Sequence, residues 1–249
     1  MSSAKATMAE EVRLQKLLAT SGIASRRKCE ELMLAGLVEV DGEIVTRLGT
    51  KVDPSRSVIR VDGKRLPPVS DSVYLVLNKP RGVVSAMSDP HSKRTLSDFV
   101  NDRPERLFHV GRLDTDTEGL IILTNDGEFA HRLAHPSYEV DKTYVAEVEG
   151  LAGKPLLAAL GHTVQLEDGP VDVSQARVLS RHGSKSIVEL TIHEGRNRIV
   201  RRLLAHLGHP VLQLTRTRIG PIKLGTLRSG QLRTLTASEL GDLLDVASL

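Results

Sequence analysis

The stretch GRLDTDTEGLIILTNDG, from Gly111 to Gly127, combines an arginine, four carboxylates and a short apolar run. The run GLIIL has the apolar, β-branched composition of a strand, and Asp114 precedes it closely, beside the apolar Leu113. A carboxylate next to buried residues is costly unless a cation is paired with it. Three interpretations of Asp114 are therefore open: a metal loop, a surface turn or a catalytic carboxylate.

The metal interpretation fails on ligand spacing. The acidic positions match the start of an EF-hand loop, with Asp114, Asp116 and Glu118 at loop positions one, three and five and Gly119 at six. Position twelve should be a bidentate Glu but is Asn125, and the intervening LIILT offers almost no oxygen ligands. The HEGRN sequence at His193 likewise places Asn197 where a zinc-protease motif needs its second His. We expect no metal and no cofactor.

The surface-turn interpretation suits NDG, residues 125–127, and explains Asp126 well. It does not explain why Arg112 and Asp114 flank Leu113 immediately before a strand. The arginine-rich GRNRIVRR, residues 195–202, could supply the cation that Asp114 needs, for a structural or a catalytic purpose.

Composition restricts the setting of the chain. Its 249 residues allow one large or two ordinary domains, and 40% of them are hydrophobic, so a sizeable core can form. Cys29 is the only cysteine, which excludes an intrachain disulfide and fits a reducing compartment. No apolar run approaches the length of a membrane span. We expect a cytoplasmic protein without membrane contact.

The first part of the chain has the pattern of a small module. Residues 1–10 are expected to be a disordered leader, and helices are expected in VRLQKLLATSG (12–22) and SRRKCEELMLAG (25–36), with Ser25 as N-cap. Asp-Gly turns at 41–42 and 62–63 indicate short hairpins. The module is predicted to span 11–66, followed by the linker 67–72.

The remaining region, 73–249, mixes strands and helices without regular alternation, which favours the α+β class. The predicted strands are VYLVLNKP (73–80), GLIIL (119–123), TYVAEVEG (143–150), PVDVSQARVL (170–179) and SIVELTIHEG (186–195). Helices are predicted in KPLLAALG (154–161), in RNRIVRRLLAHLG (196–208), and after a capping box formed by Thr236 and Glu239.

Charge is concentrated in one segment of this region. Between residues 193 and 233 there are nine basic residues and one acidic residue, a net charge of +8: Arg196, Arg198, Arg201, Arg202, Arg216, Arg218, Lys223, Arg228 and Arg233 against Glu194. A solvated helix face usually mixes both signs, so this segment predicts a polyanionic partner.

Four motifs in order resemble one family. GRLDTDTEGLIILTNDG resembles the catalytic motif of the bacterial ribosomal pseudouridine synthases, and NKPRG (78–82), KTY (142–144) and EGRNRIVRRL (194–203) stand in the order that this family shows. RLQKLLATSGIASRR and GLVEVDG resemble an S4 RNA-binding domain. The resemblance implies an S4 (αL-type) domain followed by a mixed, largely antiparallel β-sheet catalytic domain with flanking helices. It also implies isomerisation of uridine to pseudouridine in ribosomal RNA.

The resemblance also implies roles for single residues. Asp114 matches the catalytic carboxylate, acting as nucleophile at C1′ or as base at C2′. Arg201 matches the arginine that pairs with this carboxylate. Tyr144 matches the aromatic residue that stacks on the target uracil and helps to remove the C5 proton. Asp116, Glu118 and Asp126 are assigned to turn and strand-edge positions.

RNA contacts are expected on both domains. Arg112 matches an arginine that fills the space left by the flipped base, and flipping costs a few kcal/mol. Further contacts to substrate and phosphates are expected from Asn78, Lys79, Arg81, Arg196, Arg198 and Arg202. The S4 domain is expected to add Arg13, Lys16, Arg26, Arg27 and Lys28.

The motifs are closer to the large-subunit branch of the family, so 23S rRNA in a ribosome assembly intermediate is the favoured substrate of a monomeric enzyme. Two alternatives stay open: the same reaction on 16S rRNA, and a non-catalytic assembly factor that binds rRNA.

Overall fold

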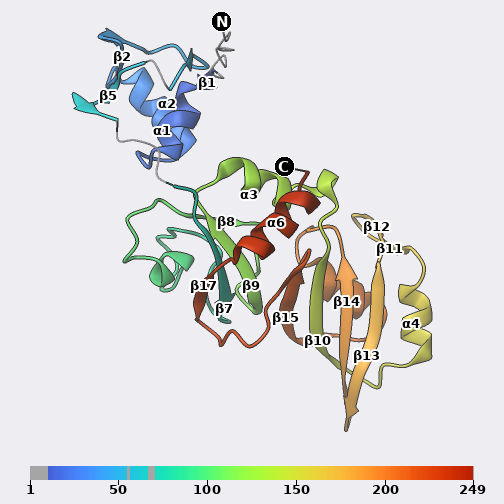
Figure 1. The fold of residues 1–249 in the computed structure, drawn as a ribbon. Helices are drawn as coiled ribbons and strands as arrows, with labels where there is room; N and C mark the ends of the chain where they lie inside the picture. The colour runs from blue at the N-terminus through green and yellow to red at the C-terminus, as the bar shows by residue number, and fades with distance from the viewer. Residues whose placement is uncertain (1–10, 55–56, 67–70, 249) are drawn as a thin grey trace, which may run out of the picture. The chain divides into compact units, whose positions relative to one another are not determined.

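The computed structural model describes residues 11–54, 57–66 and 71–248, which divide into two compact units (Figure 1). The first unit contains the described residues up to Asp71 together with Pro104–Arg106, and the second contains Ser72–Arg103 and the residues from Leu107 onward. The predicted leader, 1–10, and most of the predicted linker, 67–72, lie outside the described residues.

The first unit is built from two helices and short strands around its own core. Its elements are β1 (Val12–Arg13), α1 (Leu14–Thr20), α2 (Arg26–Leu34), β2 (Val38–Val40), β3 (Glu43–Ile44), β4 (Lys51–Val52), β5 (Ile59–Val61) and β6 (Lys64–Arg65). The Ser25 side chain accepts a hydrogen bond from the Lys28 amide, so the predicted N-cap is confirmed. Asp41 and Asp62 have φ values of 52° and 49°, as type I′ hairpin turns require. Leu14, Leu18 and Met33 are fully buried in the core.

A nine-stranded sheet organises the second unit, with the strand order β13-β14-β10-β15-β9-β7-β17 and with β8 and β16 attached to β9 and β15. The strands are β7 (Tyr74–Lys79), β8 (Phe108–Val110), β9 (Thr117–Thr124), β10 (Lys142–Glu149), β13 (Gln175–His182), β14 (Lys185–Ile192), β15 (Val211–Ile219), β16 (Ile222–Lys223) and β17 (Leu232–Thr234). The β9–β15 pair is parallel, and the other strand pairs of this sheet are antiparallel. The predicted mixed, largely antiparallel sheet is confirmed. A separate hairpin joins β11 (Val164–Leu166) to β12 (Gly169–Val171).

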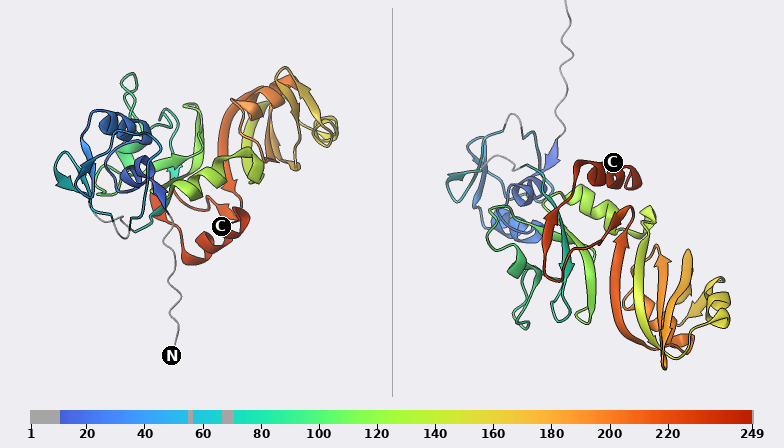
Figure 2. Two further views of the ribbon diagram at one scale, coloured as in Figure 1. Left: turned by 90° about the horizontal axis from the view of Figure 1, so that it is seen from above. Right: turned by 60° about the horizontal axis from the view of Figure 1, so that its bottom comes forward.

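Helices cover both faces of this sheet, as Figures 1 and 2 show. One face packs against α3 (Gly127–Ala134) and α6 (Ala237–Val246), and the other against α4 (Lys154–Leu160), α5 (Ile199–His206) and the 3₁₀ turn η1 (Leu96–Phe99). Leu120 and Ile122 of β9 belong to the first core, whereas Ile121 and Leu123 belong to the second. Each fully buried side chain of this size contributes about 1.5–3 kcal/mol. Burial on both faces explains why the strand has an uninterrupted apolar sequence.

Three of the differences from the sequence predictions concern β15, the strands β12 and β13, and the start of α3. The sequence VLQLTRTRI forms β15, a central strand that was not predicted because arginine and threonine alternate with its apolar residues. PVDVSQARVL forms two strands, β12 and the first half of β13. NDG was predicted to be a turn, but Asp126 caps α3 by accepting hydrogen bonds from the amides of Glu128 and Phe129. The predicted capping box at the start of α6 is confirmed.

Candidate functional site

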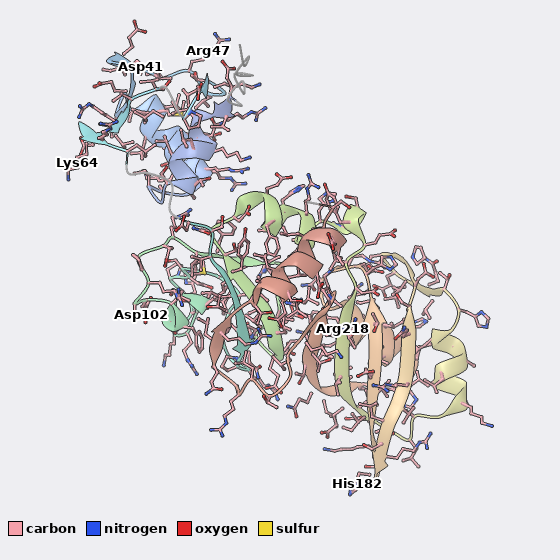
Figure 3. All side chains as sticks on the ribbon, in the orientation of Figure 1. Asp41, Arg47, Lys64, Asp102, His182 and Arg218 are labelled. Carbon is pink, nitrogen blue, oxygen red and sulfur yellow. The ribbon has the colours of Figure 1, made fainter. Side chains whose placement is uncertain are left out.

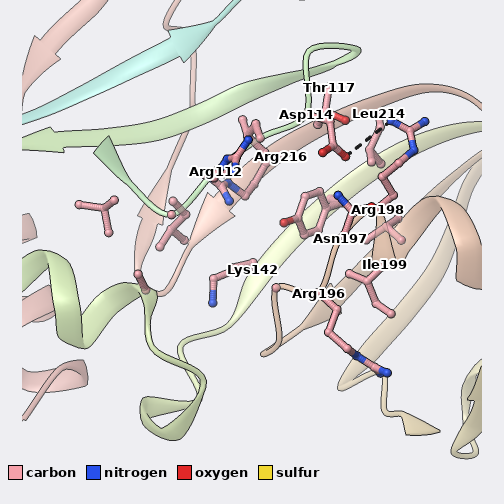
Figure 4. A pocket seen from close by; sticks show the side chains of 18 of the residues that line it. Arg112, Asp114, Thr117, Lys142, Arg196, Asn197, Arg198, Ile199, Leu214 and Arg216 are labelled. Atoms are coloured by element: carbon pink, nitrogen blue, oxygen red, sulfur yellow. Dashed lines mark ion pairs between the residues drawn. The ribbon is translucent and has the colours of Figure 1, made fainter. Parts of the chain in front are cut away.

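The site lies where β9 and β15 run side by side in parallel. Only three residue pairs join these strands, from Leu214↔Thr117 to Arg216↔Gly119. A pocket of about 390 Å³ lies at this junction, and its lining includes Asp114, Tyr144 and residues of α3 and α5 (Figure 4). The pocket therefore collects residues from separate parts of the sheet.

Gly119 allows the two strands to approach each other. A Cβ atom at this position would lie 2.3 Å from the carbonyl oxygen and 2.7 Å from the amide nitrogen of Arg216. Its φ of 109° is also one that L side chains rarely adopt. The glycine in the DTEG sequence is thus required by the fold on two separate grounds.

Backbone hydrogen bonds hold the loop that carries Asp114. The buried Ser85 hydroxyl donates to the Leu113 carbonyl at 2.7 Å and accepts from the Leu113 amide at 3.0 Å. The Gly82 amide donates to the Thr115 carbonyl at 2.7 Å, and the Thr117 amide donates to the Asp114 carbonyl at 3.0 Å. Sequence reasoning missed Ser85, because a single serine in a loop carries no pattern.

The ion pairs of the site differ from the predicted pairing. Arg198 Nη1 lies 3.9 Å from Asp114 Oδ2, and the same guanidinium donates two hydrogen bonds to the Asp116 carboxylate at 3.0 and 2.9 Å. Arg201, predicted to pair with Asp114, has its Nε 3.4 Å from Asp116 Oδ2, and its Nη2 donates to the Asp116 carbonyl at 2.8 Å. Asp116 therefore organises both arginines and is more than a turn residue.

Electrostatics agree with this arrangement. The hydrogen bond from Arg198 holds the pKa of Asp116 below its usual value, with further help from the charge of Arg201. Burial lowers the pKa of Arg201, whose side chain is only 10% exposed. Arg198 has a left-handed backbone, with φ 50°, which costs a residue with a side chain on the order of 1–2 kcal/mol. Its double hydrogen bond to Asp116 offsets that cost.

Tyr144 and two cations also line the pocket. Tyr144 is buried on β10, and Arg216 is its direct neighbour across the pair with β15. Lys142 lies two residues before Tyr144 and so on the same side of the strand. Burial, together with the positive charge of Arg216, lowers the pKa of Lys142 to about 8.

The structure contradicts the RNA contact predicted for Lys79. Its side chain is 0% exposed, and its ammonium group donates to the carbonyls of Val83 at 2.8 Å and Pro80 at 3.1 Å. Burial lowers the pKa of Lys79 to about 8. Asn78 is half-buried, and its amide donates to the Leu227 carbonyl at 2.8 Å. These two residues of NKPRG hold the chain around the site rather than presenting donors to RNA.

The predicted RNA-contact residues of the second unit divide into two groups. In the first group, Arg112 is exposed at the pocket and Arg81 is exposed at the neighbouring groove beside Asp116. In the second group, Arg196 and Arg202 already form ion pairs and hydrogen bonds with other residues of the chain. Arg196 pairs with Glu194 at 2.5 Å and donates to the Asp168 and Pro170 carbonyls, and Arg202 donates to the Asp168 carboxylate at 2.8 Å. Figure 4 shows the Arg196 guanidinium pointing away from Asp114.

Acids from elsewhere in the chain neutralise much of the basic segment 193–233. Five of its nine basic residues form ion pairs, and four of the five acids involved, Asp114, Asp116, Asp168 and Glu239, lie outside the segment. The net charge of +8 along this segment is therefore largely balanced in the fold by acids from elsewhere in the chain. Within the segment 193–233, which the structure describes in full, the exposed cations without an ion pair are Arg218, Lys223 and Arg228.

The basic residues predicted for RNA contact in the first unit are all exposed: Arg13, Lys16, Arg26, Arg27 and Lys28. Lys28 pairs with Glu31 at 2.7 Å, within the same helix. Figure 3 shows that Lys64 also projects from this unit into solvent.

Residues 11–54, 57–66 and 71–248 contain no group of three or more His, Cys, Asp or Glu side chains that could hold a metal ion. No helix in the same ranges combines the length and apolarity needed to cross a membrane.

Comparison with known proteins agrees with the geometry. The family model described as RNA pseudouridylate synthase matches residues 73–206, and the one described as S4 domain matches residues 12–58. The chain is 51% identical to an RNA pseudouridine synthase of Mycobacterium bovis over 241 residues, which cover 96% of this chain and 95% of the relative. It is 47% identical to the ribosomal large subunit pseudouridine synthase B of Bacillus subtilis over 230 residues, covering 92% and 93% of the two chains. A crystal structure of a pseudouridylate synthase superposes with a TM-score of 0.64 at 30% identity, covering 93% of this chain and 99% of the other.

An S4 domain followed by a mixed sheet with a carboxylate pocket at its parallel junction defines the class: an isomerase that acts on RNA. The chain belongs to the RNA pseudouridylate synthase family.

Proposed function

We propose that this protein converts a specific uridine of ribosomal RNA, in the large-subunit 23S rRNA, to pseudouridine, with Asp114 as the catalytic carboxylate. The observation that carries the proposal is a single pocket that holds Asp114, Tyr144 and Arg198 together. The similarity to the Bacillus subtilis large-subunit enzyme over nearly the whole chain supports the choice of substrate.

Asp114 meets the chemical requirements of the reaction. As a nucleophile, one carboxylate oxygen bonds to C1′, the C1′–N1 bond breaks, and its electron pair stays on the uracil ring. As a base, the carboxylate takes the C2′ proton while the same bond breaks. C5 then bonds to C1′, as the bond from Asp114 to C1′ breaks on the first route or as Asp114 returns the proton to C2′ on the second. The C5 proton is lost and N1 is protonated, so the atoms balance as an isomerisation on either route. The Arg198 guanidinium, 3.9 Å away, places a positive charge beside the carboxylate that both routes use.

Tyr144 supplies the surface on which the detached uracil turns. Its ring lines the same pocket as Asp114 and lies on β10, buried within the sheet, so the ring is held in place. A fixed aromatic face can stack on the base during rotation and keep it near C1′. Its hydroxyl is a candidate acceptor for the C5 proton.

RNA binding is assigned to exposed cations on both units. Arg112 lines the pocket with an exposed side chain and fills the stack after the target base has flipped. Arg81 lies at the adjacent groove and is assigned to a flanking phosphate. Arg13, Lys16, Arg26 and Arg27 of the S4 domain add phosphate contacts outside the pocket.

The test compares Asp114→Asn with Asp126→Asn in the full-length chain. Asp114→Asn should lower single-turnover pseudouridine formation by about 10⁴-fold or more, because an amide is neither nucleophile nor base. Asp126→Asn should keep near wild-type activity, since Asn caps a helix as well as Asp does. Carbodiimide treatment and primer extension on rRNA report the product. A wild-type rate from Asp114→Asn would refute the assignment.

The substrate is tested by mapping pseudouridine in both rRNAs of a strain that lacks this protein. A missing 23S modification that returns with the wild-type chain, and not with Asp114→Asn, is expected. A missing modification confined to 16S rRNA would assign the protein to the small subunit, and unchanged maps would favour a non-catalytic role.

A further inference from the structure

We propose that Arg216 and Lys142 form a cationic site at one end of the pocket that binds an anionic oxygen of the target nucleotide. The inference rests on the proposed function, because it assumes that the pocket takes a nucleotide. Figure 4 shows Arg112, Lys142 and Arg216 on one side of the pocket and the Asp114–Arg198 ion pair on the other.

Arg216 is buried and only partly satisfied. The residue is 3% exposed, and its Nε donates to the Leu120 carbonyl at 2.8 Å, just beyond the last residue pair of the β9–β15 ladder. Its Nη2 is buried without a hydrogen-bond partner among the residues that the structure describes. Because a buried unpaired donor is costly, a guanidinium fixed in this way at the pocket wall indicates a missing acceptor.

Lys142 is fixed beside it. Its ammonium donates to the Val140 carbonyl at 2.8 Å and to the His193 carbonyl at 3.4 Å, and neither partner carries charge. The nearest influences on its charge are Arg216, which opposes it, and the exposed Asp141, which favours it weakly. No described carboxylate forms an ion pair with Lys142 or Arg216. Two cations held together without an anion would be stabilised by an anionic ligand.

The site lies next to the surface proposed for the base. Tyr144 is paired directly with Arg216 across the strands, and Lys142 is two residues away on the same face. Directly paired residues have Cβ atoms about 4.5–5.5 Å apart, which places Arg216 next to a ring stacked on Tyr144. Lys142 lines the same pocket as Tyr144 and Arg216. The ligand oxygen comes from one of two sources. It is either O2 or O4 of uracil, which gains negative charge when the C1′–N1 bond breaks, or a phosphate oxygen flanking the target nucleotide.

Lys142→Met and Arg216→Gln in the full-length chain test the site, with Lys154→Met as control because Lys154 is exposed on α4. RNA affinity, its salt dependence and the single-turnover rate at saturating RNA are measured with an rRNA fragment containing the target uridine. A uracil oxygen predicts about a 10²-fold slower rate, with affinity changed by less than about 3-fold. A phosphate oxygen predicts weaker binding, a salt slope smaller by about 0.7 and an unchanged rate at saturation.

Proton uptake separates this role from a structural one. At pH 8 a phosphate oxygen beside Lys142 should raise the pKa of Lys142, so RNA binding should be accompanied by uptake of up to about half a proton per complex, and Lys142→Met should lose this uptake. A uracil oxygen becomes charged only as the C1′–N1 bond breaks, so it predicts the slower rate without proton uptake on binding. Calorimetry in two buffers of different ionisation enthalpy measures the difference. Unchanged rate, affinity and uptake in a folded Lys142→Met would overturn the site, even if Arg216→Gln failed to fold. Wild-type chain that binds the RNA without forming pseudouridine would refute the proposed function, whereas uptake lost in Lys142→Met would still support the site.

Discussion

Replacing Asp116 by Asn tests whether this carboxylate, rather than Asp114, holds the arginines of the site. The substitution keeps the side-chain shape and removes the charge that Arg198 and Arg201 share. The amide oxygen of the new Asn can still accept one hydrogen bond from Arg198. The amide nitrogen, however, would face the second N–H donor of the same guanidinium, so the second hydrogen bond is lost. Arg201 would keep its bond to the Asp116 backbone carbonyl and lose its ion pair.

The contacts set the expected magnitude. A hydrogen bond to a charged group contributes about 1.5–3 kcal/mol when buried. Both partners are partly exposed here, 43% for the Arg198 side chain and 33% for that of Asp116, so solvent screening reduces the total loss to about 1–2 kcal/mol. Arg198 also contacts Asp114, and misplacement by about 1 Å costs up to about 10²-fold in rate. We expect single-turnover pseudouridine formation to slow by about 10–100-fold, less than for Asp114→Asn.

Denaturant unfolding and single-turnover kinetics measure the two effects, with Asp102→Asn as the control, since Asp102 is exposed and projects from its loop (Figure 3). Because the pKa of Asp116 is lowered in the folded protein, its stabilisation is complete above the unfolded value of about 3.9 and is lost as pH falls through the folded value. The stability difference from wild type should thus be constant between pH 5 and 8, and shrink below about pH 4. A variant with the wild-type rate and stability would refute the role given to Asp116.

Gly119→Ala should destabilise the second unit by about 3 kcal/mol or more and abolish activity, because its Cβ would overlap the Arg216 backbone; an unfolding midpoint equal to wild type would contradict this. The pKa of Lys79 is about 8 in the folded protein, below its value in the unfolded chain. Above pH 8 the unfolded chain therefore binds more protons than the folded one, and the free energy of unfolding rises by up to about 1.4 kcal/mol per pH unit. Lys79→Met should lose that part of the rise between pH 8 and about 10.4. Parallel pH curves for the variant and wild type would show that the pKa of Lys79 is not lowered by folding. A chain starting at Ser72 should fold, because the second unit begins at this residue. It should bind rRNA more weakly with a shallower salt slope and keep a measurable rate at saturating RNA, because the S4 domain contributes to RNA affinity and not to the chemical step. Equal binding by the truncated and full chains would remove the RNA-binding role from the S4 domain.

The sequence alone determined the class of fold and the position of the loop that carries Asp114. Local signals were sufficient for this: Ser25 as a helix cap, the Asp-Gly turns, and the continuous apolar run of β9 between polar residues. Such features depend on neighbours within a few residues, so they can be read from the chain directly. The order of four motifs then indicated the family, which the comparisons confirmed.

Tertiary structure alone decided which charges meet. The predicted pairing of Asp114 with Arg201 gave way to Arg198, and both arginines share Asp116, because the β9–β15 junction brings residues more than eighty positions apart into contact. The same long-range contacts brought acids to the basic segment, and they buried Lys79, which looked like an RNA ligand in the sequence. Burial and ion pairing depend on what the fold places around a side chain, and a count of charges along the chain does not contain that information.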